Sequence, residues 1–120
     1  MAERLDQPTG LVVHGTGPDP ETWLPHAMRA ALNAVADLGD GVPVELVVQG
    51  PAVGRLTAAQ GPTEQLPALM DAGIAVQACG NSLRSAGVSA EELAPGVGVV
   101  SAAVGHLARR QWAGWAYVRI

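Results

Sequence analysis

The sequence predicts an α/β protein with a mostly parallel sheet between two layers of helices. Short apolar segments alternate with longer amphipathic ones about five times along the chain. The short segments are continuously apolar, as expected for strands that are covered on both faces. A chain of 120 residues has the length of one ordinary domain, and 48% hydrophobic residues exclude a wholly disordered chain. We expect a flexible tail over residues 1–9 and a single domain over residues 10–120.

The first half of the chain begins with a strand and a long helix. Residues 11–13 are apolar and β-branched, which predicts a buried strand. Asp19 is placed to cap a helix that has Pro20 at its first position, and Gly39 ends that helix. Apolar side chains recur every three or four residues within it and define one buried face. They are Leu24, Ala27, Met28, Ala31, Leu32, Val35 and Leu38.

The rest of the chain continues the alternation. Thr63 is placed to cap a helix that Gly73 ends. Ser89 and Glu92 have the spacing of a capping box, which predicts a single helical turn there. The other expected elements are strands at 44–48, 74–78, 97–100 and 115–118, and helices from 52, from 79 to about 87 and over 102–110.

Composition limits the classes of function. Seven Arg against eleven Asp and Glu give a net charge of −4, and Lys is absent. Such a chain lacks the basic face that nonspecific nucleic-acid binding needs. Without Lys it has no P-loop lysine, no Schiff-base lysine and no anchor for pyridoxal phosphate. Three scattered His and one Cys do not have the spacing of a metal site, so we expect no metal and no other cofactor.

The sequence also predicts where the protein works. No apolar run reaches the roughly 18 to 20 residues that a membrane helix needs. The first residues, Met1-Ala2-Glu3-Arg4, are charged and do not lead into the apolar core of a secretory signal. We therefore expect a cytoplasmic protein without membrane contact, in which a lone thiol stays reduced.

Residues that can bear chemistry follow the expected strands. The carboxyl ends of parallel strands share one edge of the sheet, and ligands of open α/β sheets bind along that edge. We expect these residues to converge there although they are distant in sequence. They are His14, Gly15, Gln49, Gly50, Cys79, Gly80, Asn81 and Ser101.

Cys79 is the most informative of these residues. It stands where a strand passes into a helix, so free backbone N–H groups and the helix dipole favour its thiolate. Gly80 allows a tight turn beside the sulfur. A free Cys is also common as a small buried apolar side chain. Its position alone therefore leaves both interpretations open.

Several segments together carry a family pattern. Residues 78–83 read ACGNSL, residues 93–97 read LAPGV, and residues 110–117 read RQWAGWAY, which fits the closing pattern RQ-x-x-G-x-x-Y. With VVQGPAV at residues 47–53, they resemble the DsrE/DsrF-like family of intracellular sulfur-relay proteins. The resemblance covers nearly the whole chain from residue 11. It implies a three-layer α/β/α fold with a five-stranded parallel sheet, assembled as trimers or hexamers.

The resemblance also implies a function. Cys79 matches the sulfur-accepting cysteine of the family, which predicts a persulfide carrier or sulfurtransferase with separate sulfur donor and acceptor proteins. Relatives often carry His where Gln49 stands, and a Gln cannot act as a base near pH 7. His14 is then the remaining candidate base at that edge. The residues expected to shape the pocket are His14, Gln49, Gly50, Gly80, Asn81 and Ser82.

Two other functions remain open from the sequence. Gln49 and the lack of a firm acid–base pair fit a noncatalytic ligand-binding or regulatory module that uses the same pocket. A purely structural subunit of a larger relay complex is the third hypothesis. Away from the pocket, we expect His106 at the surface or an interface, and Arg109-Arg110 as a solvated helix end. Three aromatic residues pack either in the core or against a second subunit, and these are Trp112, Trp115 and Tyr117.

Overall fold

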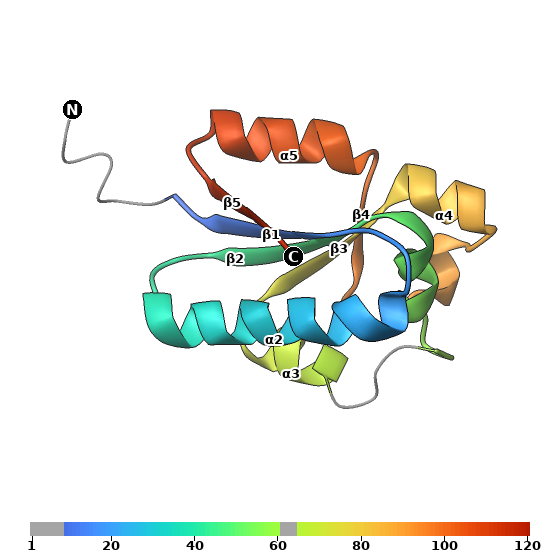
Figure 1. Ribbon diagram of the computed structural model, residues 1–120, viewed down its shortest axis with the longest axis horizontal. Helices are drawn as coiled ribbons and strands as arrows, with labels where there is room; N and C mark the ends of the chain where they lie inside the picture. Colours follow the sequence, from blue (N-terminus) through green and yellow to red (C-terminus); the bar gives the residue numbers. More distant parts are fainter. Residues whose placement is uncertain (1–8, 61–64) are drawn as a thin grey trace.

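A computed structural model describes residues 9–60 and 65–120 of the chain. The tail predicted for residues 1–9 lies outside the described residues except for Thr9, and so does the cap predicted at Thr63. The described residues form a five-stranded sheet in the order β4-β3-β2-β1-β5 (Figure 1). Every pair of neighbouring strands is parallel, which confirms the α/β prediction.

The elements follow each other in the predicted order. The strands are β1 (Leu11–Gly15), β2 (Val44–Val48), β3 (Ala75–Cys79), β4 (Gly98–Val100) and β5 (Ala116–Arg119). The α-helices are α2 (Pro20–Leu38), α3 (Gln65–Asp71), α4 (Gly80–Ala86) and α5 (Ala103–Trp112), and the 3-10 helices are η1 (Gly50–Leu56) and η2 (Ala90–Glu92).

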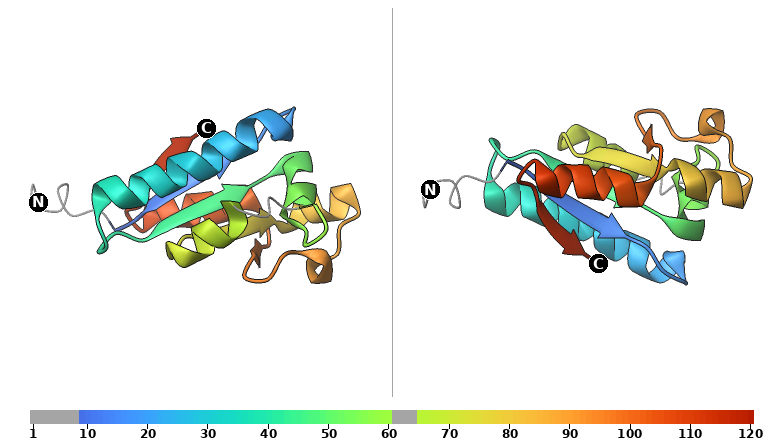
Figure 2. Two further views of the ribbon diagram at one scale, coloured as in Figure 1. Left: turned by 90° about the horizontal axis from the view of Figure 1, so that it is seen from below. Right: turned by 90° about the horizontal axis from the view of Figure 1, so that it is seen from above.

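The helices form two layers around the sheet. Helices α2 and α3 cover one face, and α5 lies over the opposite face (Figure 2). The short helices α4, η1 and η2 lie beyond the carboxyl ends of the strands (Figure 1). The chain therefore runs from β1 to β4 across the sheet and returns through α5 to place β5 beside β1.

Two local predictions need correction. The helix expected from Ala52 is a 3-10 helix that already begins at Gly50. Asp19 precedes α2 as expected, but its side chain makes no capping hydrogen bond. Its backbone instead adopts a left-handed conformation, with φ of 59°. Asp tolerates that conformation better than most residues do. The capping box at Ser89 and Glu92 is confirmed, with both reciprocal hydrogen bonds present.

The interior consists of two clusters of unequal size. The larger lies between the sheet and the α2–α3 layer and includes Met28, Leu46 and Leu69. The smaller lies under α5, and Trp115 packs against its edge. Its buried members are Val12, Val47, Cys79, Ala103 and Leu107. The single thiol therefore belongs to the interior that α5 covers.

A buried carboxylate ties α5 to the sheet. Glu45 of β2 is 2% exposed and accepts hydrogen bonds from His106 Nε2 at 2.6 Å and from Arg110 Nε at 3.2 Å. Gln77 Nε2 donates to the same carboxylate at 3.4 Å, and the Arg110 guanidinium lies 4.4 Å from the centre of the Trp115 ring. His106, expected at the surface or an interface, is therefore largely buried against Glu45, and Arg110, expected as a solvated helix end, is 36% exposed with its guanidinium on the same carboxylate.

These contacts keep Glu45 ionised. Burial alone would raise the pKa of the Glu45 carboxyl, but the hydrogen bonds and charges of Arg110 and His106 hold that pKa below its ordinary value. A buried charge with such partners avoids the large cost of an unpaired one. The ion cluster thus fixes the position of α5 over the sheet.

Candidate functional site

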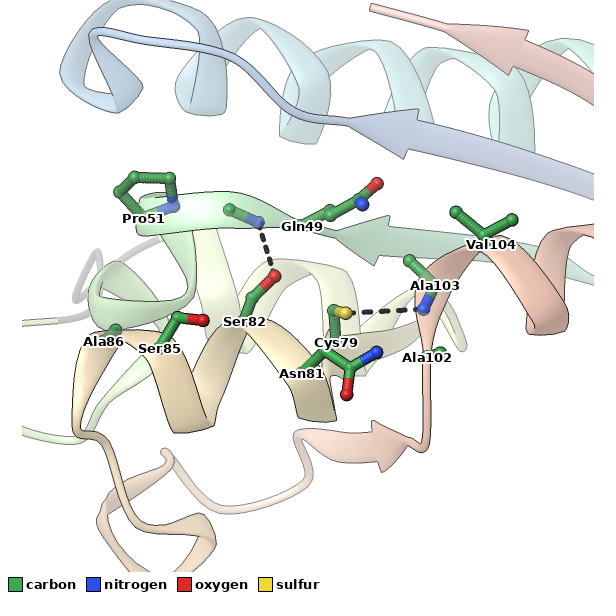
Figure 3. A pocket seen from close by; sticks show the side chains of 11 residues that line it. Gln49, Pro51, Cys79, Asn81, Ser82, Ser85, Ala86, Ala102, Ala103 and Val104 are labelled. Atoms are coloured by element: carbon green, nitrogen blue, oxygen red, sulfur yellow. Dashed lines mark hydrogen bonds between the residues drawn. The ribbon is translucent and has the colours of Figure 1, made fainter.

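Cys79 ends β3 and is the N-cap residue of α4. The residue is 2% exposed, and its Sγ accepts a hydrogen bond from the backbone N–H of Ala103 at 3.3 Å (Figure 3). Ala103 is the first residue of α5, where backbone N–H groups lack partners within the helix. The sulfur therefore lies between the beginnings of two helices.

The surroundings of the sulfur favour the thiolate. Burial alone would raise the pKa of the Cys79 thiol, because it penalises the charged form. Hydrogen bonds from the Ser82 hydroxyl and from the backbone N–H groups of Ala103, Ser82 and Asn81 outweigh burial and bring that pKa below its ordinary value. Ser82 Oγ also accepts the N–H of Gly50 at 2.8 Å, which leaves the hydroxyl proton free to point to the sulfur.

Gly80 brings α4 close to the connection between β4 and α5. A Cβ at this position would lie 2.9 Å from the carbonyl oxygens of both Val100 and Ser101. Both are backbone atoms, so neither can move without shifting the chain that leads to Ala103. The glycine is therefore required for close packing around the thiol, rather than for backbone freedom.

A cavity of about 340 Å³ opens beside the sulfur. Five of the residues predicted for the site line it, and they are Gln49, Gly50, Cys79, Asn81 and Ser82 (Figure 3). Gly80 is buried beneath the cavity rather than in its wall. The remaining lining residues were not predicted from the sequence, and they are Pro51, Ser85, Ala86, Ala102, Ala103 and Val104. Apart from the thiol, every lining side chain is neutral, so hydrogen-bond donors supply the polarity.

His14 lies outside this wall. Its Nε2 donates to Oε1 of Gln49 at 2.8 Å, and its Nδ1 accepts from the Tyr117 hydroxyl at 2.7 Å. Burial, followed by the charge of Arg119, lowers the pKa of His14, while the hydrogen bond to Gln49 raises it; the pKa lies below its ordinary value. Both ring nitrogens of the neutral imidazole are thus occupied, and His14 has no lone pair free to act as a base in the cavity.

Of the three C-terminal aromatic residues, Trp115 fits the expectation of core packing. Trp115 is partly buried against the smaller interior cluster. Trp112 is 82% exposed on α5, and Tyr117 is exposed on β5 although its hydroxyl reaches His14. No signal in the sequence indicated that the Tyr117 hydroxyl would contact His14, because the two residues are 103 positions apart.

The described part of the chain has neither a metal-binding cluster nor a membrane-spanning helix. Over residues 9–60 and 65–120, no cluster of three or more His, Cys, Asp or Glu is arranged to hold a metal ion. In the same residues, no helix combines the length and the apolar character needed to cross a membrane.

Known proteins share the sequence pattern and the fold of this chain. A model of the DsrE/DsrF-like family matches residues 9–120. No curated protein gives a significant match. The structure of MTH1491 from Methanobacterium thermoautotrophicum, a protein of unknown function, is 34% identical over 92% of this chain and 97% of that one, with a TM-score of 0.83.

Two more distant structures share the fold. YchN from E. coli is 20% identical, with 95% of this chain and 100% of that chain covered and a TM-score of 0.73. BT1422 from Bacteroides thetaiotaomicron, a conserved protein of unknown function, is 18% identical, with coverage of 93% and 95% and a TM-score of 0.72. At these identities the likeness concerns the fold alone.

Proposed function

Because this chain belongs to the DsrE/DsrF-like family, we propose that it carries sulfur as a persulfide on Cys79. One observation carries the proposal. The only thiol of the chain lies among hydrogen-bond donors that favour its charged form, beside a cavity large enough for a small sulfur donor group. Donors that lower the pKa of a thiol are a feature of reactive cysteines.

The proposed chemistry consists of two exchanges. The Cys79 thiolate attacks the outer sulfur of a donor persulfide, the S–S bond of the donor breaks, and the donor leaves as a thiolate. Cys79 then carries the transferred sulfur. The thiolate of an acceptor attacks that outer sulfur, the new S–S bond breaks, and Cys79 leaves as a thiolate again. Neither exchange changes the overall oxidation state, and neither requires a second cysteine in this chain.

The neutral cavity suits this chemistry. Each exchange begins and ends with a thiolate, so the reaction needs stabilised negative charge more than it needs a general base. The N–H of Ala103 donates to Cys79 Sγ, and the backbone of Asn81 and Ser82 lowers the pKa of that thiol. Gln49 in place of the histidine of many relatives is consistent with a carrier that does not depend on a base.

Sulfur loading and thiol reactivity test the proposal together. Incubation with a small persulfide donor is expected to add one sulfur atom per chain, measured by intact mass. The alkylation rate of Cys79 is expected to reach half its maximum at a pH below the value of about 8.5 for a free thiol, because the folded surroundings favour the thiolate. The denatured chain is the control and should return to the ordinary value.

A noncatalytic ligand-binding module is the second candidate. The 2% exposure of Cys79 favours it, since a sulfur donor must reach the thiol through the cavity. A folded chain that gains no sulfur and alkylates with an ordinary pH profile would replace the carrier proposal with this one.

We further propose a homo-oligomer, with the trimer or hexamer that the family resemblance implies. β5 is an edge strand that exposes Val118, and the chain end exposes Ile120. On α5, Trp112 and Val104 are also largely exposed. Exposed apolar edges of this kind are usually covered by another chain. Native mass spectrometry at micromolar concentration is expected to detect a multiple of the chain mass, and a monomer would contradict the prediction.

The partners follow from the chemistry. We propose one protein that donates sulfur and another that accepts it, and a cytoplasmic location, where the thiol of Cys79 stays reduced. The third hypothesis, a structural subunit of a larger relay complex, requires that this chain loads no sulfur alone but assembles stably with a sulfur-carrying partner.

A further inference from the structure

A row of hydrogen-bonded side chains crosses three neighbouring strands and ends at the cavity. It begins at Tyr117 on β5, continues through His14 on β1 and ends at Gln49, directly after β2. The two hydrogen bonds measure 2.7 Å and 2.8 Å, and the rings of Tyr117 and His14 are tilted by 48° with centres 5.7 Å apart. Only Gln49 of the three lines the cavity that holds Cys79.

The orientation of the Gln49 amide sets the direction of the row, because its Oε1 lies against Nε2 of His14. The amide oxygen of Gln49 can only accept, so Nε2 of His14 carries the hydrogen between them. The neutral imidazole then offers a lone pair at Nδ1, which accepts the Tyr117 hydroxyl. Rotating the Gln49 amide by half a turn would require the other tautomer of His14, with Nδ1–H donating to the Tyr117 hydroxyl.

The oxygen of the Gln49 amide is therefore held by its hydrogen bond with His14. This oxygen is turned toward His14 of β1, and the amide nitrogen is the end that the row leaves free (Figure 3). The NH2 group provides two donors, and the row uses neither. Because Gln49 lines the cavity, the wall thus gains a neutral donor at the end of β2.

We propose that His14 and Tyr117 are positioning residues that hold the Gln49 amide as a hydrogen-bond donor to an anionic group in the cavity. This inference rests on the proposed function, in which that group is the outer sulfur of the Cys79 persulfide. An S–S bond of about 2.05 Å carries the outer sulfur beyond the N–H groups around Sγ and further into the cavity. Gln49 then supplies the donor that the backbone at Cys79 does not.

Paired alkylating reagents test the inference without any sulfur donor. Iodoacetate and iodoacetamide deliver the same carbon to Cys79, but only iodoacetate brings a negative charge into the cavity. Tyr117→Phe removes one hydroxyl and releases the row, so the ratio of the iodoacetate rate to the iodoacetamide rate is expected to fall roughly two- to tenfold, the value of one ordinary hydrogen bond. A purely structural role of Tyr117 would slow both reagents equally.

A second variant establishes that the effect passes through Gln49. Gln49→Met is expected to lower the same ratio, and Tyr117→Phe is expected to lower it no further in that background. Gln49→Glu still accepts from His14 but turns a carboxylate oxygen to the cavity, and should lower the ratio more than Gln49→Met does. The control is His26→Gln, which replaces an exposed histidine of α2 on the other face of the sheet.

The outcomes separate the two proposals. Additive effects of Tyr117→Phe and Gln49→Met, or an unchanged ratio in both, would overturn the inference even if Cys79 loads sulfur. A ratio that responds as expected in a chain that loads no sulfur would support the positioning row and overturn the carrier proposal. A Cys79 that reacts with neither reagent would contradict an anion-receiving cavity and overturn the inference.

Discussion

Replacing Cys79 by Ser is expected to abolish sulfur loading completely while the fold survives. Serine is nearly the same shape, and its Oγ can still accept the Ala103 N–H that Cys79 Sγ accepts. Its hydroxyl does not ionise near neutral pH and cannot form a persulfide. Since the chain has a single Cys, no other residue can take over. Intact mass after exposure to a persulfide donor measures loading, and thermal unfolding checks the fold.

Ser82→Ala is the matched control for this variant. It keeps the thiol but removes the hydroxyl that lowers the pKa of Cys79 and accepts the Gly50 N–H. Loading should slow without disappearing, because the pKa of Cys79 rises and less thiolate is present at pH 7. Sulfur found on the Cys79→Ser chain in amounts equal to wild type would remove the thiol from the mechanism.

Gly80→Ala is expected to affect both stability and the site. The new Cβ would lie 2.9 Å from two backbone carbonyl oxygens, of Val100 and Ser101. Relief requires moving the connection that leads to Ala103, which weakens the hydrogen bond to Cys79 Sγ. We expect a loss of about 1–3 kcal/mol in the free energy of unfolding, the usual cost of overpacking a close contact. Chemical denaturation measures that loss, and the alkylation pH profile should move upward with it.

Gly41→Ala is the control with the opposite expected sign. No atom lies within 4 Å of a Cβ at that position, and its backbone is outside the left-handed region. Removing glycine there reduces the freedom of the unfolded chain and should stabilise the fold by about 0.4–1 kcal/mol. A Gly80→Ala chain as stable as the Gly41→Ala chain would show that the contact at Gly80 is not restrictive.

Local patterns predicted most of the fold. The apolar periods located the strands and helices within one or two residues, because strands buried on both faces and helices buried on one face have different repeats. Cys79 could be placed between a strand and a helix for the same reason. Five of the eleven residues that line the cavity could also be predicted, since the topology brings strand ends together whatever their distance in sequence.

Pairings between distant side chains could not be predicted. Glu45 stands in an otherwise apolar strand, and its partners His106 and Arg110 lie 61 and 65 residues further along the chain. The contribution of α5 to the cavity was missed for a related reason. The period of a helix predicts which face is buried, but not that its first N–H, at Ala103, meets a particular sulfur.

Helix α5 affects both how accessible Cys79 is and how its thiolate is stabilised. The helix covers the sulfur and also donates to it through Ala103, and the Glu45 cluster holds it in place. A fluctuation that lifts α5 from the sheet exposes the thiol and removes one of its donors in the same event. In that event the loss of the Ala103 donor raises the pKa of Cys79, whereas the loss of burial lowers it, so α5 acts on the thiolate in two opposing ways.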